Sequence, residues 1–291
     1  MSGGVARGRS RRGRTALGLL SIAALALVVY AAFVEPRRLV RREATVTLHR
    51  WPAALDGLRV VAVSDLHAGG WTMTAARLDA LVDRINAERA DLVVLLGDFV
   101  RSHSRARLEP EELARPLARL RAARGVFAVL GNHDWWYDGE RVRRALEAAH
   151  IRVLEGEAAA AGPGGLWLAG VPDEMTRAPR PARALDGVPG DATTIVLTHN
   201  PDAFPEIPER AAITLAGHTH GGQIVLPIVG APFVPSRFGQ RYLRGLIVEN
   251  GRHLFVTTGV GTSILPLRFG VPPEYALITL RAPAPRATSR P

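Results

Sequence analysis

Cysteine is absent from this chain of 291 residues. The protein therefore contains neither a disulfide framework nor a thiolate ligand, and any metal ion must be bound by His, Asp, Glu or Asn side chains. Lysine is absent as well, because all 37 basic residues are Arg. Such a pattern is typical of a biased nucleotide composition and carries little information about function.

Basic and acidic residues are nearly balanced outside the N-terminal segment. Residues 1–42 contain nine Arg and one acid, Glu35, for a net charge of +8, whereas the rest of the chain contains 28 Arg and 26 acids, for a net charge of +2. An excess of two charges cannot neutralise many phosphates. The composition therefore disfavours a duplex-binding groove, and we do not expect nucleic acid as a partner.

One long apolar run stands near the N-terminus. Residues 15–34 contain no charge and, as a helix, could cross about 30 Å of hydrocarbon. We interpret them as a single-pass transmembrane anchor, and residues 1–14 as a basic cytoplasmic n-region. An export signal is the alternative, since Ser10-Arg11-Arg12 loosely resembles a twin-arginine signal and Ala24-Leu25-Ala26 fits a cleavage site. Cleavage there would leave LVVYAAFV exposed on the mature protein, so we favour an uncleaved anchor.

The remaining chain divides into a linker, one large domain and a tail. Residues 35–55 are interpreted as a juxtamembrane linker that ends in an edge strand at 45–51. We expect the folded domain at 56–282 and a disordered Pro/Arg-rich tail at 283–291.

Short apolar runs recur along the domain and predict strands. The first five lie at 58–63, 91–96, 125–130, 193–198 and 213–216, with helical patterns at 74–89, 111–123 and 139–149. Further strands are expected at 166–170, 246–249, 253–258 and 275–281, without clear helices between the last three, which suggests a second, partly antiparallel sheet. The Ala/Gly-rich segment 156–165 is interpreted as a loop. The fold class is therefore α/β, a layered sandwich of two mixed β-sheets flanked by helices, with one N-terminal transmembrane helix.

Potential metal ligands follow each of the first five strands. They are Asp65, His67, Asp98, Asn132, His133, Asp134, His199, His218 and His220. The ends of such strands meet at one sheet edge, where open α/β sheets place their sites. Carboxylate and amide oxygens combined with imidazoles suit Zn, Mn or Fe. Glycine precedes three of the clusters, at 97, 131 and 217, and permits close backbone approach there.

The motifs D-L-H, G-D, G-N-H-D, T-H and G-H-T-H, in this order over residues 65–220, resemble those of the calcineurin-like metallophosphoesterases. The resemblance implies a dinuclear, metal-dependent phosphoric ester hydrolase that uses a metal-activated water. It implies that Asp65, His67 and His220 hold one metal ion, that Asn132, His199 and His218 hold the other, and that Asp98 bridges them. It also implies that His133 is the catalytic histidine near the leaving group and that Asp134 orients it.

The substrate is less well defined by these motifs than the reaction. Phosphomonoesters and phosphodiesters both fit. Gly221-Gly222-Gln223, followed by the Pro-rich apolar segment 227–239, is similar to the membrane-associated bacterial branch of the superfamily. Together with the apolar anchor, this segment favours an enzyme of the bacterial inner membrane, with its active domain outside the cytoplasm and a lipid-linked or envelope phosphoester as substrate. A UDP-diacylglucosamine-type pyrophosphate hydrolase and a nucleotide phosphodiesterase stay open, and a non-catalytic metal-binding scaffold is the alternative from another class.

Several other residues have open interpretations. Trp135-Trp136-Tyr137 could line the substrate site, dip toward lipid headgroups or simply pack, and segment 227–239 could form a hydrophobic rim or an ordinary surface loop. Arg101 could reach a substrate phosphate or remain solvated. Asn200 is expected to form a turn. Surface or structurally satisfied positions are expected for His49, His103, His150 and His253.

Overall fold

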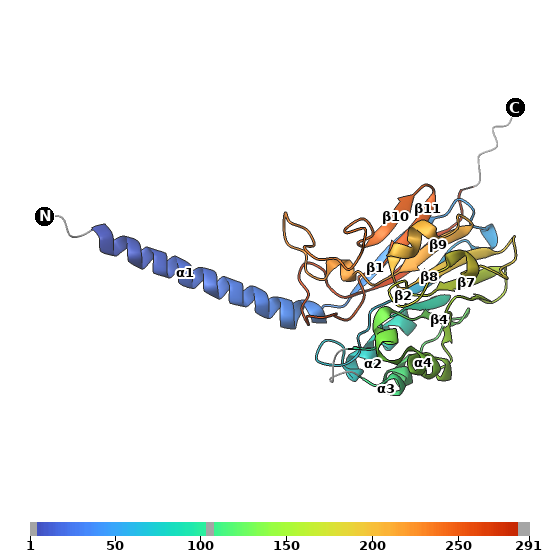
Figure 1. The fold of residues 1–291 in the computed structure, drawn as a ribbon, viewed down its shortest axis with the longest axis horizontal. Coiled ribbons are helices and arrows are strands. Elements are labelled where there is room, and N and C mark those ends of the chain that lie inside the picture. Colours follow the sequence, from blue (N-terminus) through green and yellow to red (C-terminus); the bar gives the residue numbers. More distant parts are fainter. Residues whose placement is uncertain (1–4, 103–107, 285–291) are drawn as a thin grey trace, which may run out of the picture.

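The computed structural model describes residues 5–102 and 108–284, with the backbone alone for residues 5–13. Figure 1 shows a two-sheet domain from which one long helix extends. This helix, α1 (Val5–Val29), continues through a π-helical turn (Tyr30–Val34) into the 3₁₀ turn η2 (Glu35–Arg37). The apolar stretch Arg14–Arg37 is long and apolar enough to cross a membrane.

The first sheet has the strand order β1-β12-β2-β3-β4-β5. Its strands are β1 (Val40–Thr47), β12 (Glu274–Arg281), β2 (Leu58–Val63), β3 (Leu92–Leu96), β4 (Val126–Val129) and β5 (Arg152–Val153). Strands β2 to β5 are parallel, β12 is antiparallel to β2, and β1 is parallel to β12. The helices of this half are α2 (Ala75–Ala87), α3 (Pro110–Leu117) and α4 (Asn132–Ala148), which pack on one face of the sheet.

The second sheet has the strand order β10-β11-β9-β8-β7-β6. Its strands are β10 (Gly245–Glu249), β11 (Arg252–Val256), β9 (Ala211–Ala216), β8 (Thr193–Thr198), β7 (Leu166–Val171) and β6 (Ala158–Ala160). The central strands are parallel, and the outer pairs β10/β11 and β6/β7 are antiparallel. The short elements are η3 (Ala53–Leu55), α5 (Pro181–Ala184), η4 (Pro201–Glu206) and η5 (His220–Gly222).

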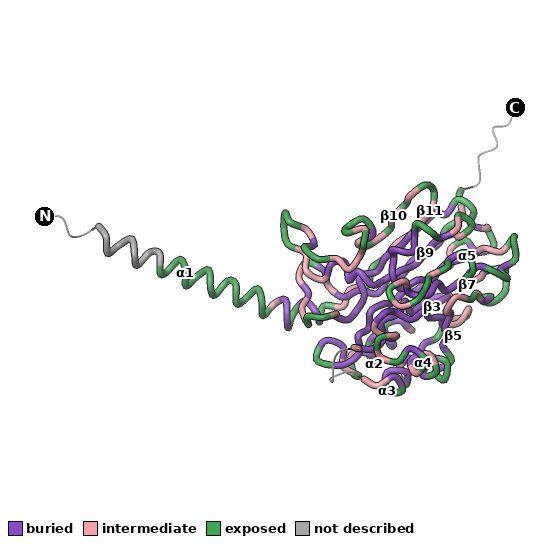
Figure 2. Tube along the Cα trace, in the orientation of Figure 1, coloured by how far each residue is buried: buried purple, intermediate pink, exposed green. Residues whose placement is uncertain are grey.

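The two sheets pack face to face through alternate side chains of their strands. Val60, Val94 and Val129 of the first sheet meet Leu168 and Ile195 of the second in one fully buried cluster. Figure 2 shows this buried interior as continuous purple tube between exposed green loops. Burial on both faces explains why these strands appear in the sequence as unbroken apolar runs.

The predicted fold class is confirmed, with two mixed sheets flanked by helices and one N-terminal apolar helix. Four local predictions were wrong. Segment 275–281 belongs to the first sheet, because β12 inserts between β1 and β2. The edge strand begins at Val40 since it pairs residue by residue with β12. The expected loop 156–165 contains β6, and α4 begins at Asn132, not 139.

The C-terminal end of the apolar helix is attached to the domain. Ala31, Ala32, Glu35 and Pro36 are buried, whereas the apolar side chains between Leu17 and Val29 are exposed. The Arg268 amide donates a hydrogen bond to the Ala31 carbonyl at 2.9 Å. The helix therefore leaves the domain in a defined direction.

Candidate metal centre

Every potential ligand expected from the sequence lies at the carboxyl end of a central strand. Asp65 and His67 follow β2, Asp98 follows β3, and Asn132 opens α4 directly after β4. On the second sheet, His199 follows β8, and His218 and His220 follow β9. Because the two sheets pack face to face with these ends at one edge, the structure brings all seven side chains into one buried cluster.

Three side chains form the first group of possible ligands. Asp65 Oδ1 lies 3.3 Å from His220 Nε2 and 3.9 Å from His67 Nε2, and the two imidazole Nε2 atoms lie 3.2 Å apart. All three side chains are buried. Ligand atoms this close together can surround one small cation.

Asp98, His199 and His218 form the second group of possible ligands. Asp98 Oδ2 lies 3.3 Å from His199 Nε2 and 3.5 Å from His67 Nε2, so this carboxylate stands between the two groups. His218 Nδ1 lies 3.1 Å from His199 Nε2. Asp98, His199 and His218 offer ligand atoms within 4.8 Å of one another.

The donor set fits a metal ion in two further respects. Asp65 Oδ1 and Asn132 Oδ1 are buried and have no hydrogen-bond partner among the described residues. Buried acceptors without a donor are costly unless they face a cation. His199 Nδ1 lies 2.7 Å from the Leu96 carbonyl, which can only accept, so Nδ1 carries a proton and Nε2 is the nitrogen that could bind a metal.

The backbone around the cluster is strained. Five of the seven expected ligands have positive φ angles, namely Asp65 (56°), His67 (41°), Asp98 (56°), His218 (68°) and His220 (51°). Non-glycine residues adopt this region at a cost, and such strain collects at functional sites. The neighbouring glycines allow the loops to meet: a Cβ on Gly131 would lie 2.2 Å from Asp98 Oδ1, and one on Gly217 would lie 1.9 Å from Ser64 Oγ.

Electrostatics separate the histidines into two kinds. Burial lowers the pKa of His67 and of His220 well below the ordinary value, and lowers the pKa of His218 to about 4. These rings are therefore neutral near pH 7 and have a lone pair available for a metal. Burial also opposes the charged form of His199, but the adjacent Asp98 raises the pKa of His199 well above its ordinary value. A cation that displaces this proton would take over the pairing with Asp98.

His133 lies at the mouth of the cluster and is half-buried. Ser102 Oγ lies 2.8 Å from its Nδ1, and Ser263 Oγ lies 3.3 Å from its Nε2. The ring also contacts Trp136, with ring centroids 5.0 Å apart, and His67, with centroids 4.7 Å apart. Two hydroxyls thus bracket the two ring nitrogens of this histidine.

Asp134 has different partners from those expected. One carboxylate oxygen accepts hydrogen bonds from the Asp98 and Gly131 amides, and the other from the Phe99 and Val100 amides. Burial and the negative charge of Asp98 raise the pKa of Asp134, while the Gly131 and Val100 amides oppose the rise. The carboxylate therefore fixes the loop that carries Asp98, and Ser102 is the hydrogen-bond partner at His133 Nδ1.

A cavity of about 480 Å³ opens beside the cluster. Its lining includes the potential ligands Asp98, Asn132, His218 and His220, the half-buried His133, and the apolar side chains of Trp136, Met175, Phe233, Ile264 and Leu265. The cavity therefore combines potential metal ligands with apolar side chains. Of the aromatic triplet, Trp136 lines this cavity, Trp135 stacks beneath Arg177 at 3.6 Å, and Tyr137 donates a hydrogen bond to Glu109.

The remaining sequence interpretations have mixed outcomes. Asn200 caps η4, where its side chain accepts a hydrogen bond from the Asp202 amide, so the predicted turn is confirmed. His49 and His150 are exposed and His253 is half-buried, as expected. His103 lies outside the described residues. Arg101 is half-buried and lines a smaller cavity together with His67 and His133.

Sequence reasoning missed several residues that support the site. Ser102 and Ser263 had no signal in the sequence, because serine is common in loops. Gln223 belongs to the Gly-Gly-Gln extension, but its role was not predicted. Its side-chain nitrogen donates hydrogen bonds to the Ser263 and Leu265 carbonyls, and its side-chain oxygen accepts one from the Ser263 amide. Arg268 is fully buried and donates to the carbonyls of Gly261, Thr258 and Gly259.

Comparison with known proteins agrees with this fold. The Calcineurin-like phosphoesterase family matches residues 58–222. An uncharacterized metallophosphoesterase of Bacillus subtilis, YkuE, is 30% identical over 266 residues, which are 87% of this chain and 89% of that protein. The phosphodiesterase YaeI of Escherichia coli is 31% identical over 76% of this chain and 82% of its own length.

Longer relatives also exist. A transmembrane protein with metallophosphoesterase domain from Danio rerio is 29% identical over 95% of this chain, which spans 64% of that protein. The chain spans 60% of a metallophosphoesterase of Helicobacter pylori. The two-sheet fold and its His/Asp cluster define a metal-dependent phosphoester hydrolase. The chain belongs to the calcineurin-like phosphoesterases.

Proposed function

We propose that this protein is a dinuclear phosphodiesterase or phosphomonoesterase anchored to the bacterial inner membrane, and that it hydrolyses a lipid-linked or envelope phosphoester outside the cytoplasm. The observation that carries the dinuclear assignment is the position of Asp98. Its Oδ2 atom lies 3.5 Å from His67 and 3.3 Å from His199, each of which belongs to a separate ligand group. A carboxylate shared in this way suits two neighbouring cations.

The proposed ligands divide into two sets. Asp65, His67 and His220 would hold one metal ion, Asn132, His199 and His218 would hold the other, and Asp98 would be shared between them. The neutral state of His67, His218 and His220 and the protonated Nδ1 of His199 support these assignments. Mn, Zn and Fe all accept such oxygen and imidazole ligands.

The chemistry needs charge neutralisation, a nucleophile and a proton for the leaving group. Two bound cations would supply charge neutralisation for a phosphoryl group and a water of lowered pKa as the nucleophile. His133 then provides the proton for the leaving alcohol from its position at the mouth of the cluster. Ser102 and Ser263 hold the ring in place through its two nitrogens. Asp134 acts indirectly, by fixing the backbone that presents Asp98.

The cavity wall supports an ester with an apolar part. The apolar side chains of Trp136, Phe233, Ile264 and Leu265 line the same cavity as the potential ligands. The apolar helix supports a membrane location, and a relative carries the name of a transmembrane protein. A relative named as a phosphodiesterase supports a diester as the preferred bond. We take residues 56–282 as the catalytic domain.

Activity of the full-length chain in detergent micelles tests this function. We expect hydrolysis of bis-p-nitrophenyl phosphate after loading with Mn or Zn, and loss of that activity in the Asp98→Ala variant. Parallel assays with p-nitrophenyl phosphate determine the preference between diester and monoester. Folded, metal-loaded protein without activity on either ester would argue for a non-catalytic metal-binding protein.

A further inference from the structure

Apolar side chains are displayed on the loops beside the cavity. Residues 224–235 contain no charged side chain. Leu226 and Gly230 exchange backbone hydrogen bonds of 2.9 Å and close a hairpin with the tip Pro227-Ile228-Val229. Ile228 is fully exposed, Val229 is 63% exposed, and Ile264 on the neighbouring loop is 77% exposed. Exposed apolar residues collected on adjacent loops are typical of an interaction surface.

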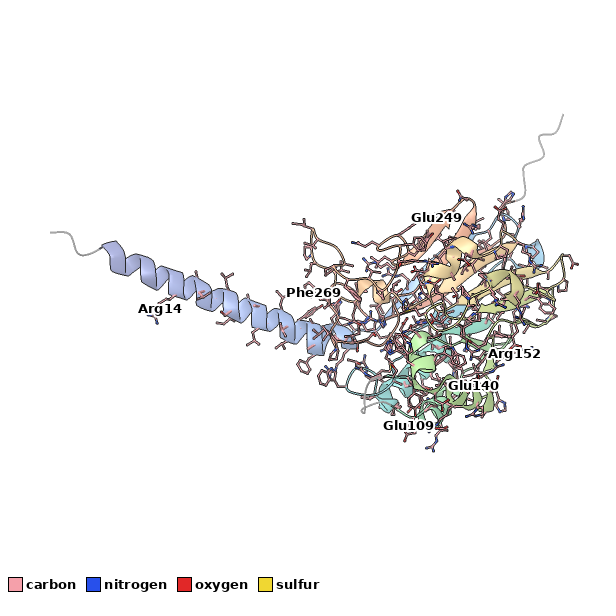
Figure 3. All side chains as sticks on the ribbon, viewed as in Figure 1. Arg14, Glu109, Glu140, Arg152, Glu249 and Phe269 are labelled. Carbon is pink, nitrogen blue, oxygen red and sulfur yellow. The ribbon has the colours of Figure 1, made fainter. Side chains whose placement is uncertain are left out.

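The hairpin is connected to the end of the apolar helix by hydrogen bonds and ring contacts. The Arg268 amide donates to the Ala31 carbonyl at 2.9 Å, and the Tyr30 and Phe269 rings meet edge to face at 6.4 Å. Phe269 in turn pairs with Ile224 at the base of the hairpin, where the Val225 amide donates to the Phe269 carbonyl at 2.7 Å. Figure 3 labels Phe269 beside the helix end. The hairpin base therefore has a fixed position relative to that end.

The neighbouring loops are held to the same frame by polar groups. The Gln223 side chain forms three hydrogen bonds with Ser263 and Leu265, and so fixes the loop that carries Ile264. The Asp202 carboxylate accepts hydrogen bonds from the Ser236 hydroxyl and the Arg237 amide, and so fixes the C-terminal side of the apolar segment. These hydrogen bonds fix the backbone of the loops that carry the exposed apolar side chains.

Aromatic and basic residues continue this surface toward the helix. Phe33 of the π-helical turn stacks on Trp71 with ring centroids 5.7 Å apart, and both are about half exposed. Arg37 and Arg38 follow directly and are exposed. Trp is enriched at membrane–water interfaces, and interfacial aromatic and arginine side chains anchor the end of a transmembrane segment. The helix end thus marks the level of the lipid interface.

The hairpin is long enough to reach lipid from there. Ile228 is four residues from Ile224, a reach of up to about 13 Å at about 3.3 Å per residue. The headgroup layer on each side of a bilayer is about 5–8 Å thick. Figure 1 shows the orange segment after residue 220 projecting from the side of the domain at which α1 ends. The tip can therefore cross the headgroup layer of the membrane that holds the helix.

From these contacts we infer that the hairpin tip Ile228-Val229 and the loop at Ile264-Leu265 insert into the bilayer that holds α1, so that the cavity opens at the lipid surface. Leu265, Ile264 and Phe233 also line that cavity. The substrate class that fits is an amphiphilic phosphoester whose acyl chains stay in the bilayer while its phosphate reaches His133 and the metal centre. This inference rests on the proposed phosphoesterase function and membrane anchor.

The absence of cysteine makes a direct labelling test possible, since the chain has no other thiol that would react with the label. Single cysteines at Ile228→Cys and Ile264→Cys in the full-length protein are labelled with the fluorophore NBD. The labelled protein is reconstituted in vesicles of phosphatidylethanolamine and phosphatidylglycerol with or without dibrominated phosphatidylcholine. Val248→Cys is the matched control, because Val248 is 54% exposed on β10, whose end at Glu249 lies away from the helix end in Figure 3.

We expect blue-shifted emission and at least two-fold quenching by brominated lipid at positions 228 and 264, and neither effect at position 248. Quenching by aqueous iodide at 228 and 264 equal to that at 248 would overturn the inference. Protection from iodide without quenching by brominated lipid would also overturn it, in favour of a protein contact. Hydrolysis of bis-p-nitrophenyl phosphate by the Ile228→Asp variant, whose side chain is outside the cavity wall, tests the proposed function separately. That activity should equal the wild-type value whichever result the labels give.

Discussion

The backbone amide of Asp98 donates a hydrogen bond to the Asp134 carboxylate at 2.9 Å. The same carboxylate accepts the amides of Phe99, Val100 and Gly131, so one buried side chain joins the loop after β3 to the start of α4. Asp98 lies between the two ligand groups, and Asn132 opens that helix. The geometry of the metal centre therefore depends on a residue that is not expected to touch a metal.

The Asp134→Asn variant should bind metal about 10–100-fold more weakly, because supporting groups of this kind typically contribute that much to metal affinity. The new amide nitrogen would face backbone amides and leave donors unpaired, at a cost of about 1–3 kcal/mol for each buried group. Metal titration followed by calorimetry or mass spectrometry measures the affinity. Unchanged metal binding combined with a lower kcat would instead support an orienting role of Asp134 on His133.

The Ser102→Ala variant should lower kcat about three- to ten-fold, the effect of losing one hydrogen bond of about 1 kcal/mol at His133. KM and metal content should stay at their wild-type values, because Ser102 hydrogen-bonds to His133 Nδ1 and His133 is not one of the proposed ligands. The pH profile of kcat should shift when this hydrogen bond is lost. The Ser102→Thr variant, which keeps a hydroxyl, should recover part of the wild-type kcat. Equal losses of kcat and of bound metal would show that Ser102 supports the fold of the loop instead.

Glu155 is expected to make stability depend on pH. Burial raises its pKa from 4.5 to about 7, so its stabilising contribution is complete below pH 4.5 and is lost as the pH rises through about 7. At about 1.36 kcal/mol per pKa unit, ionisation costs at most about 3 kcal/mol. Glu155→Gln keeps an acceptor for the Leu130 amide. Its thermal midpoint relative to wild type should therefore rise by several degrees between pH 5 and pH 8.5, and a pH-independent difference would contradict this account.

The Asp202→Ala variant should release the segment around Arg237. In the structure the Arg237 amide donates to the Asp202 carboxylate, and its guanidinium donates to the Asp202 carbonyl and to Glu174. Trypsin cleaves after arginine, so cleavage at Arg237 should become about ten-fold faster, as measured by mass spectrometry of the fragments. Arg244, on the same connection, provides the internal control. Equal acceleration at both sites would indicate general unfolding.

The sequence was most informative where one physical rule acts alone. Strands buried on both faces appear as apolar runs, so the bounds of β2 and β8 were predicted to the residue. The ligand cluster could be predicted because parallel strands bring their carboxyl ends to one edge. In contrast, the insertion of β12 between β1 and β2 depends on contacts over more than 200 residues of sequence, which no local pattern encodes.

The supporting contacts of the site were hidden for a related reason. Asp134 was expected to orient His133, the residue next to it. In the structure its carboxylate, at the first turn of α4, accepts hydrogen bonds from the Asp98 and Phe99 amides of another loop. The local sequence does not show that these amides lie there. Ser102 and Ser263 reach His133 from loops 31 and 130 residues away. Only the assembled sheets bring them together.

The metal content of the purified full-length chain tests the central claim most directly. Ala31, Ala32, Glu35 and Pro36 are buried and β1 begins at Val40, so the intact chain is the right material. Wild-type protein loaded with Mn or Zn should contain about two metal ions per chain. His133→Ala should retain both and lose most turnover, whereas Asp98→Ala should lose at least one ion together with activity. One ion per chain in the wild type, or equal metal loss in both variants, would contradict a dinuclear centre bridged by Asp98.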